Sequence, residues 1–558
     1  MRSLIAALVL ALVLLPLVPT KASAAPAQLR AYWVDAFGEG IFTEAQIDKL
    51  VAQAKAANFN ALVVQIGRRG DCFCNNASMP RTQAAIAARP FDPLQYLIDK
   101  AHPEGIQVHA WIITTAIWNS LAPPLDATHV YNTHGRSKTG RDNWLLRRND
   151  GADRVGIDFY LDPGHPDAAD YIAEMYLSVI RNYDVDGVNF DRVRYPDGGF
   201  PQPWGYNPVS VARFQEATGR TDVPVPGDLQ WAQWRRDQVT NIVRKVYVQA
   251  YAIKPHVTIS ADTITYTNAP QSAGGWQATR TYAEVLQDWR GWMEEGILDL
   301  NIPMNYKREY CTATDRSGRG CFDLDQQRLY AEWNDYAKDH QYSRQTVIGA
   351  AIYLNTVAGS VAQVRKALAP STAGNSGVGW VGYAYRTPDC RTNNSCLSFR
   401  SGDLSRAELT RALTQPSEYD PITPAVFAEP AAVPRMSWKD SPTLGHARGT
   451  VRSSSGAPLD QVRVDIYDAE TEAFITTKVT DGSGWFGVVD LNPRKYKAVV
   501  DQSVVYGRNL THFTVGAGKL STMFIEVRLV GERPNARRGP DVAGFEIEEV
   551  DGQPNGER

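Results

Sequence analysis

Between residue 29 and about residue 415, short apolar runs alternate with stretches of helical periodicity, and this pattern narrows the possible folds more than any other feature. The apolar runs cover 29–35, 61–67, 108–114, 187–192, 257–262, 299–306, 347–354 and 378–385. The helical stretches cover 44–58, 93–103, 167–183, 231–252, 282–295, 324–339, 361–368 and 404–414. Eight strand–helix units predict an α/β chain that closes into a parallel (β/α)8 TIM barrel. A doubly wound open sheet is the alternative, although no glycine-rich phosphate turn follows the first strand.

The pattern changes after this region. Residues 416–442 are rich in Pro and Ala, a composition that predicts a linker. Residues 443–530 show alternating runs separated by turn signals such as Thr480-Asp481-Gly482. This alternation predicts a small all-β sandwich of the Ig-like or transthyretin-like kind. The polar residues 531–558 are expected to form a disordered tail. The barrel domain is thus placed at 25–415.

The N-terminus has the features of a secretory signal. Arg2 precedes an apolar run over residues 4–18, and Ala22-Ser23-Ala24 matches a small-x-small cleavage site. The run is shorter than the roughly 20 residues that a membrane span needs, which disfavours an uncleaved anchor. We therefore expect cleavage of residues 1–24 near Ala24 and an extracytoplasmic location, secreted or in the cell envelope. After cleavage no segment is expected to cross a membrane.

The six cysteines occur as close pairs in polar loops. The pairs are Cys72 with Cys74, Cys311 with Cys321, and Cys390 with Cys396. In an exported protein such pairs predict local disulfides, and the Cys-x-Cys pair gives the most strained ring. A zinc site is the alternative, but the chain lacks a C-x-x-C pair. No metal and no cofactor is predicted.

The charge balance narrows the possible partners. Lys and Arg total 58 against 61 for Asp and Glu, a formal net charge of -3, which does not suggest nucleic-acid binding. The sequence has 14 Trp and 25 Tyr, side chains that pack in cores and also stack on sugar rings. We expect a monomer whose partner is a polysaccharide.

The fourth apolar run ends in polar residues where a barrel places its active site. Gly187, Asn189 and Asp191 share one face of the strand, with Asp191 last, at the mouth. Asp191 is followed by Arg192 and Arg194. One interpretation is a catalytic carboxylate. The other is an Asp that pairs with one of these arginines to fix the loop.

The remaining strand ends are also polar or aromatic. They contribute Asp35, Arg68, His109, Trp111, Asp262, Asn305, Tyr306, Tyr353 and Tyr385. Carboxylates and amides satisfy sugar hydroxyls, and aromatic faces stack on sugar rings, so the set predicts substrate-binding residues of a polysaccharide site, together with Asn189 and Arg194. For each aromatic residue taken alone, packing is the favoured interpretation; the eight strand ends taken together favour a sugar site.

Glycoside hydrolysis needs two carboxyl groups, one as acid and one as base or nucleophile. Besides Asp191, the candidates are Asp262, Asp35, Glu39 and Glu309. Asp262 is the expected partner because it ends the adjacent strand. Apolar surroundings would raise its pKa and suit it to be the acid, while Asp191 beside two arginines would stay ionised. The opposite assignment remains open.

Two motifs carry a resemblance to a known family. They are Leu161-Asp162-Pro163-Gly164-His165-Pro166 and Phe190-Asp191-Arg192-Val193-Arg194-Tyr195-Pro196, and with Gly105-Ile106-Gln107-Val108-His109-Ala110-Trp111 they resemble the glycosyl-hydrolase-like family 10. The resemblance covers roughly residues 29–415. It implies a TIM barrel, export, hydrolysis of polysaccharide glycosidic bonds, with cell-wall glycan as a candidate substrate, and a catalytic role for Asp191. The fifth strand departs from the Ser-Pro version of relatives and reads Ser260-Ala261-Asp262.

The C-terminal segment resembles a carboxypeptidase-regulatory-like sandwich, through Gly449-Thr450-Val451 and Thr480-Asp481-Gly482-Ser483-Gly484-Trp485-Phe486. That resemblance implies a spacer or an accessory binding domain. For the whole chain the leading hypothesis is a secreted glycoside hydrolase with a two-carboxylate mechanism. The alternatives are a non-catalytic carbohydrate-binding barrel of the cell envelope and a structural envelope protein.

Overall fold

The computed structural model describes residues 26–529, apart from 393–395, 397–400, 502, 504 and 508. The predicted signal sequence and the predicted tail therefore lie outside the described residues. A helix both long enough and apolar enough to cross a bilayer is absent from this described part of the chain.

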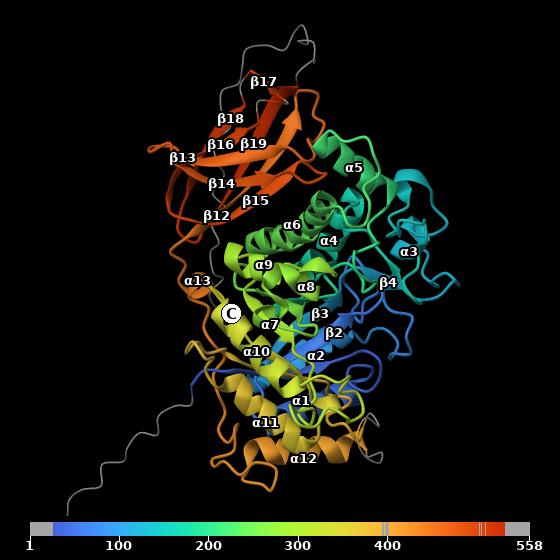
Figure 1. Ribbon diagram of the computed structural model, residues 1–558, viewed down its shortest axis with the longest axis vertical. Helices are drawn as coiled ribbons and strands as arrows, with labels where there is room; N and C mark the ends of the chain where they lie inside the picture. The colour runs from blue at the N-terminus through green and yellow to red at the C-terminus, as the bar shows by residue number, and fades with distance from the viewer. Residues whose placement is uncertain are drawn as a thin grey trace, which may run out of the picture.

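Eight parallel strands form a closed barrel, as the sequence pattern predicts, and helices lie around it (Figure 1). They are β1 (Leu29–Val34), β2 (Ala61–Gly67), β3 (Gln107–Ile113), β6 (Gly187–Asp191), β7 (Thr258–Ile264), β8 (Leu300–Met304), β10 (Ile348–Ala351) and β11 (Gly379–Tyr383). Strand β11 pairs with β1, and β10 pairs with β8 through Gly349 and Met304, so the ring has no open edge. This closure excludes the doubly wound sheet.

Helices surround the barrel on its outer side. The main ones are α1 (Glu44–Ala56), α2 (Pro93–Ala101), α4 (Pro166–Asn182), α6 (Leu229–Ile253), α9 (Trp289–Glu295), α10 (Gln326–Asp339), α11 (Val357–Leu368) and α12 (Gly402–Thr414). Their starts follow from local chemistry: the side chains of Thr43, Asp92 and Asp228 each accept a hydrogen bond from the first turn of the helix that follows. Shorter elements are β4 (Ala116–Trp118), β5 (Phe159–Tyr160), β9 (Gln345–Thr346), α3 (Val130–His134), α5 (Pro208–Thr218) and α7 (Pro270–Ala273).

One predicted helix is wrong in extent. The stretch 282–295 contains two helices, α8 (Arg280–Ala283) and α9, rather than one. Leu286 between them has a left-handed backbone (φ 54), which no α-helix accommodates. Asp288 then accepts a hydrogen bond from the Gly291 N–H and starts α9 as a new helix.

Large aromatic side chains lie inside the barrel and require small residues opposite them. A Cβ atom on Gly349 of β10 would come within 2.2 Å of the Trp33 ring, which reaches across from β1. A Cβ atom on Gly187 of β6 would come within 2.3 Å of His109 Nδ1 on β3. These two glycines leave the space that the larger side chains fill.

Residues 416–442, for which the sequence predicts a linker, lie against the barrel at the N-terminal ends of its strands; we call this segment the strap. Its Phe427 is fully buried, with ring centroids 6.0 Å from Phe59 and 6.3 Å from Trp380. Its short helix α13 (Ser437–Asp440) brings Lys439 Nζ to 2.6 Å from Asp299 Oδ2, directly before β8. The strap therefore covers the face of the barrel opposite the strand ends that carry the candidate site.

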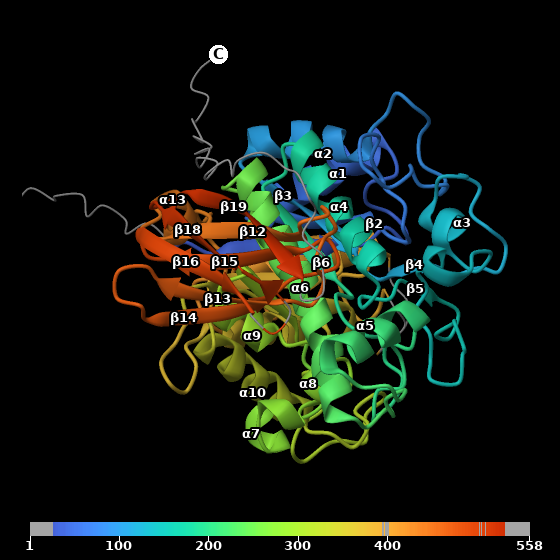
Figure 2. The same cartoon turned by 90° about the horizontal axis from the view of Figure 1, so that it is seen from above.

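Two four-stranded sheets follow the strap. One contains β12 (Gly445–Ser453), β15 (Trp485–Leu491), β17 (Val505–Tyr506) and β19 (Leu520–Leu529); the other contains β13 (Arg463–Asp468), β14 (Phe474–Val479), β16 (Arg494–Val500) and β18 (Leu510–Val515). Their facing sides share one apolar core that includes Ile466, Phe486 and Tyr496. Seen from above, the pair of sheets lies over α6 (Figure 2).

Ion pairs join the two sheets to the barrel. The two carboxylate oxygens of Asp460 accept hydrogen bonds from Nε and Nη2 of Arg213, each at 2.6 Å. Lys245 on α6 lies 2.8 Å from Asp481, and Arg344 lies 2.7 Å from Asp490. The side chains on the barrel side are largely buried, so these pairs fix the sheets against the barrel more firmly than exposed pairs would.

The cysteines form the three predicted local disulfides: Cys72–Cys74, Cys311–Cys321 and Cys390–Cys396. All six sulfur atoms are thereby used, so the alternative of a zinc site at these cysteines is wrong.

Candidate active site

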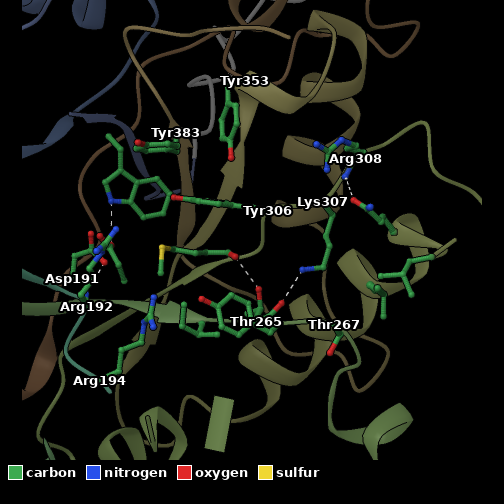
Figure 3. Close-up of a pocket in the computed structure, with 18 of the residues that line it drawn as sticks. Asp191, Arg192, Arg194, Thr265, Thr267, Tyr306, Lys307, Arg308, Tyr353 and Tyr383 are labelled. Atoms are coloured by element: carbon green, nitrogen blue, oxygen red, sulfur yellow. Dashed lines mark hydrogen bonds between the residues drawn. The ribbon is translucent and has the colours of Figure 1, made fainter. Parts of the chain in front are cut away.

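A cavity of about 480 Å³ opens at the carboxyl ends of the barrel strands (Figure 3). It is lined by Trp33, Trp111, Asp191, Arg192, Arg194, Asp262, Ile264, Thr265, Tyr266, Thr267, Met304, Tyr306, Lys307, Arg308, Phe322, Leu324, Gln326, Leu329, Tyr353 and Tyr383. Six of the predicted site residues are among them: Trp111, Asp191, Arg194, Asp262, Tyr306 and Tyr353. Asp191 and Asp262 are the only acidic side chains in this lining.

Asp191 is the last residue of β6 and is 9% exposed. Its Oδ1 accepts the Arg192 N–H at 2.6 Å, and its Oδ2 accepts the indole N–H of Trp111 at 3.2 Å. Arg192 has a left-handed backbone (φ 52), a conformation uncommon outside glycine and enriched at functional sites. Both carboxyl oxygens are therefore acceptors, which is the bonding pattern of a carboxylate.

Neither arginine side chain next to Asp191 pairs with it in the described structure. Arg192 donates to Tyr160 Oη at 3.0 Å and lies 3.4 Å from Asp158, while Arg194 lies 3.3 Å from Asp197. The interpretation of Asp191 as a loop-fixing partner of these arginines thus finds no support in the geometry.

Asp262 lies on β7, beside Asp191 on β6. The strand register pairs Phe190 with Ala261, so the two carboxyl groups follow at adjacent positions. Asp262 is 2% exposed, and its Oδ1 accepts the Trp33 indole N–H at 3.1 Å. Burial first, and the charge of Asp191 second, raise the pKa of Asp262 well above its usual range. The Asp262 carboxyl group therefore holds its proton more tightly than an ordinary Asp does.

Tyrosine and tryptophan rings form one wall of the cavity. The rings of Tyr306 and Tyr383 are stacked with centroids 5.5 Å apart. Trp33 and Tyr353 meet Tyr306 edge-on, at 6.1 and 6.4 Å. Rings with exposed apolar faces suit the C–H faces of a sugar.

Lys307 and Arg308 lie across the cavity from Asp191 (Figure 3). Lys307 is 7% exposed, and its Nζ donates to the Thr265 carbonyl at 2.8 Å. Among the described residues no carboxylate forms an ion pair with it. Burial alone lowers the pKa of Lys307 to about 7.

A second, smaller hollow of about 120 Å³ adjoins the first. It is lined by Phe37, Gln65, Arg68, Arg69, Trp111, Ile113, Ala116, Asp158, Asp191, Arg192 and Tyr383. Arg68, another predicted site residue, is found here.

Five predicted substrate-binding residues line neither hollow: Asp35, His109, Asn189, Asn305 and Tyr385. All are buried, and each has protein partners. Asp35 accepts hydrogen bonds from Phe37 N and Arg386 Nε. Asn305 Nδ2 donates to the Tyr330 carbonyl and to Asn334.

The other three of these residues lie deeper or to one side. His109 packs against Gly187 inside the barrel. Asn189 Nδ2 donates to Ser260 Oγ at 3.0 Å, and Tyr385 Oη donates to Gln53 at 2.8 Å.

The alternative carboxylates Glu39 and Glu309 also stand outside the cavity lining. Glu39 pairs with Lys49 at 2.7 Å, and Glu309 pairs with Lys366. They have the partners of structural ion pairs, which leaves Asp191 and Asp262 as the two acids at the site.

Sequence reasoning did not select several residues that the structure brings to the cavity: Trp33, Arg192, Thr265, Lys307 and Tyr383. The alternation of side chains along a strand could have identified Trp33 and Tyr383, because each lies at or near the end of a barrel strand. Thr265 and Lys307 come after β7 and β8 have ended, so no strand periodicity reaches them. In the described part of the chain, no cluster of three or more His, Cys, Asp or Glu could hold a metal ion.

A family model described as "Glycosyl hydrolase-like 10" matches residues 28–327. Glycosyl hydrolase YngK of Bacillus subtilis (strain 168) is 25% identical over 270 residues, which cover 46% of this chain and 48% of that protein. Glycosyl hydrolase DigH of Escherichia coli (strain K12) is 26% identical over 279 residues, 47% of this chain and 58% of that protein. The matches thus span about half the length of these curated relatives.

The solved structures that match this chain include the glycoside hydrolase domain of PgaB (BpsB) from Bordetella bronchiseptica. It has 14% sequence identity and a TM-score of 0.44, covering 64% of this chain and 94% of that one. The catalytic domain of beta-amylase from Paenibacillus polymyxa has 13% identity and a TM-score of 0.44, covering 69% of this chain and 97% of that one.

Proposed function

Because the chain belongs to the glycosyl hydrolase-like 10 family, we propose that it is an exported glycoside hydrolase that cleaves the glycosidic bonds of a polysaccharide. The observation that carries this proposal is the pair Asp191 and Asp262: two carboxyl groups on adjacent strands, in the same cavity, with unlike surroundings. Glycosidases use one carboxylic acid and one carboxylate in this way.

The unlike surroundings of the two carboxyl groups support different roles for them. Asp262, kept neutral by burial and by the charge of Asp191, is the general acid that protonates the oxygen of the departing sugar. Asp191, which accepts an N–H bond on each oxygen, is the ionised partner that attacks the anomeric carbon directly or through a water. The stacked rings of Tyr306 and Tyr383 support the sugar.

Export is supported by two features. The first 24 residues have the composition of a secretory signal, and the three disulfides suit an oxidising compartment. A cell-envelope polysaccharide, which the family resemblance implies, is therefore the first substrate to test.

The test is reducing-sugar release by the purified mature chain. The panel contains peptidoglycan with and without stem peptides, α- and β-glucans, and amino-sugar polymers. We expect release from one class, and loss of at least about 10³-fold in kcat for Asp191→Asn with an unchanged thermal midpoint. Full activity of Asp191→Asn on that polysaccharide would remove Asp191 from the mechanism.

A carbohydrate-binding barrel without catalysis is the second candidate, and the depth of Asp262 favours it, because an acid must reach the glycosidic oxygen. Calorimetry separates the two. Glycan binding by the folded chain, with no reducing ends released from any polymer of the panel, would establish the binding function instead.

A further inference from the structure

The two hollows at the strand ends meet at the catalytic carboxylate. Trp111, Asp191, Arg192 and Tyr383 line both of them. Asp191 therefore stands between two lined spaces rather than at the closed end of one. A hydrolase that removes terminal units closes off the space on one side of the scissile bond, whereas neither hollow here is an enclosed cavity.

Gln65 on β2 provides an oriented donor to the second hollow. It is fully buried, and its Oε1 accepts the Ala36 N–H at 2.9 Å, which fixes the direction of the carboxamide. The Nε2 atom finds no acceptor among the described residues. A buried amide donor without a partner is costly in a folded protein unless a ligand or water supplies the acceptor.

Phe37 gives the same hollow an aromatic surface. Its side chain is 52% exposed, although it lies beside a buried strand end. The guanidinium groups of Arg68 and Arg69 lie 5.6 and 5.9 Å from its ring centroid and hold its orientation. Arg68 is in turn held by a hydrogen bond to the Ala36 carbonyl at 2.5 Å. An exposed ring beside an amide donor is a surface on which a sugar unit can stack and bond at once.

We propose that the polysaccharide binds across Asp191 with sugar units in both hollows, so that the enzyme cuts internal bonds, and that Phe37 and Gln65 form the subsite on the side away from Lys307. This inference rests on the proposed glycosidase function. The large cavity holds the units on one side of the scissile bond, and the Phe37 hollow holds at least one unit on the other.

The first experiment measures which bonds are cut. Chito-oligosaccharides and cello-oligosaccharides from dimer to octamer, labelled at the reducing end, are offered beside the polysaccharide that the parent cleaves. We expect products of intermediate length at the earliest times and a value of kcat/KM that rises with chain length. Release of a single small product from the first time point, with long chains persisting, would overturn the proposal.

The second experiment removes the proposed subsite. Phe37→Ala and Gln65→Met should lower kcat/KM about tenfold on every oligomer that is cleaved, mainly through KM, because each cleaved bond requires a sugar unit in the Phe37 hollow. Phe37→Tyr, which keeps the ring, should restore the parent pattern. Phe200→Ala is the matched control, because Phe200 is 73% exposed and lines neither hollow. Variants that behave like Phe200→Ala on every length would contradict the assignment.

A binding measurement covers the case in which nothing is cleaved. Calorimetric titration of the full chain with the same oligomers should show an affinity that rises with length until both hollows are filled, and Phe37→Ala should remove the last part of that rise. An affinity that stays flat beyond the dimer would contradict the two-sided groove. Cleavage that persists in Asp191→Asn would instead contradict the proposed catalytic pair.

Discussion

Asp262 acquires a raised pKa from its position, because a strand buried on both sides places its carboxyl group among apolar atoms and beside a second carboxylate. The sequence indicated this pair, since the carboxyl ends of adjacent strands are recognisable from the alternation of residue types. The alternation does not predict how deep in the barrel each side chain lies. Asn189 and His109 share the inward-facing pattern but line neither hollow; Asn189 Nδ2 donates to Ser260 and His109 Nε2 bonds with Gln107.

The proposed role of Asp262 as the general acid predicts how the activity should depend on pH. A general acid must carry its proton, so the rate should be highest below its pKa and fall as pH rises through it. Trp33→Phe removes an N–H donor that favours the charged carboxylate, so the alkaline limb of kcat/KM should move to higher pH. Trp111→Phe acts on Asp191 instead and should leave the alkaline limb in place. An alkaline limb that moves equally in both variants would exclude Asp262 as the acid.

The burial of Lys307 lowers the free energy of unfolding at neutral pH. Its pKa is about 7 when folded and near 10.4 when unfolded, so between these values the unfolded chain binds one more proton and stability rises with pH. Lys307→Met should raise the free energy of unfolding by about 1–3 kcal/mol at pH 7, a gain that disappears above about pH 10, and should weaken substrate binding. Urea unfolding at pH 7 and pH 10 measures this. Lys439→Met is the control and should destabilise, because it leaves the buried Asp299 without its cation.

At the scale of elements, the strands were the most predictable part. Every barrel strand lies within two or three residues of its expected position, because each is an apolar run between turn signals. The bounds of the helices were less predictable where a capping residue starts a new helix within a continuous helical pattern, as at Asp288. The loops that complete the cavity were not predictable, since disulfide-bonded loops have no repeating pattern.

The loop closed by Cys311–Cys321 is one of these elements. It leads directly into Phe322 and Leu324, which line the large cavity. Replacing both cysteines by serine should raise KM several-fold with little change in kcat, and should lower the free energy of unfolding by about 2 kcal/mol. Steady-state kinetics and chemical unfolding measure the two effects.

The Cys390–Cys396 bridge provides the matched control, because no described residue between 387 and 401 lines a hollow. Its removal should reduce stability and leave KM unchanged. An equal rise in KM for both pairs of substitutions would mean that the first loop has no special relation to the substrate.

For the whole molecule, the contact between the sheets and the barrel contains a pH-sensitive residue. His446 on β12 is buried edge-on against Tyr247 and Tyr251 of α6, and its Nδ1 accepts the Asp490 N–H at 3.2 Å. Burial, followed by the charges of Arg344 and Lys439, lowers the pKa of His446 to about 3.

Stability should therefore fall as the solution becomes more acidic. Between pH 6.5 and pH 3 the unfolded chain binds a proton that the folded chain excludes, which costs up to about 1.4 kcal/mol per pH unit. Thermal midpoints at pH 7 and pH 5 should differ more for the parent than for His446→Phe. His512→Phe, at an exposed position of β18, should keep the full difference. An identical loss in all three proteins would show that His446 does not control this contact.

The strap also determines the order in which the fold can be completed. Phe427 covers Phe59 and Trp380, and Asp299 meets its cation only at Lys439. A ribosome makes the chain from its N-terminus, so all eight barrel strands emerge before the segment that covers their lower ends. A growing chain lacks the ring that packs against Phe59 and Trp380 until residue 427 has been made, and Asp299 lacks its lysine until residue 439 has been made. The barrel strands are therefore synthesised first, and the packing at their N-terminal ends is completed only when the strap follows.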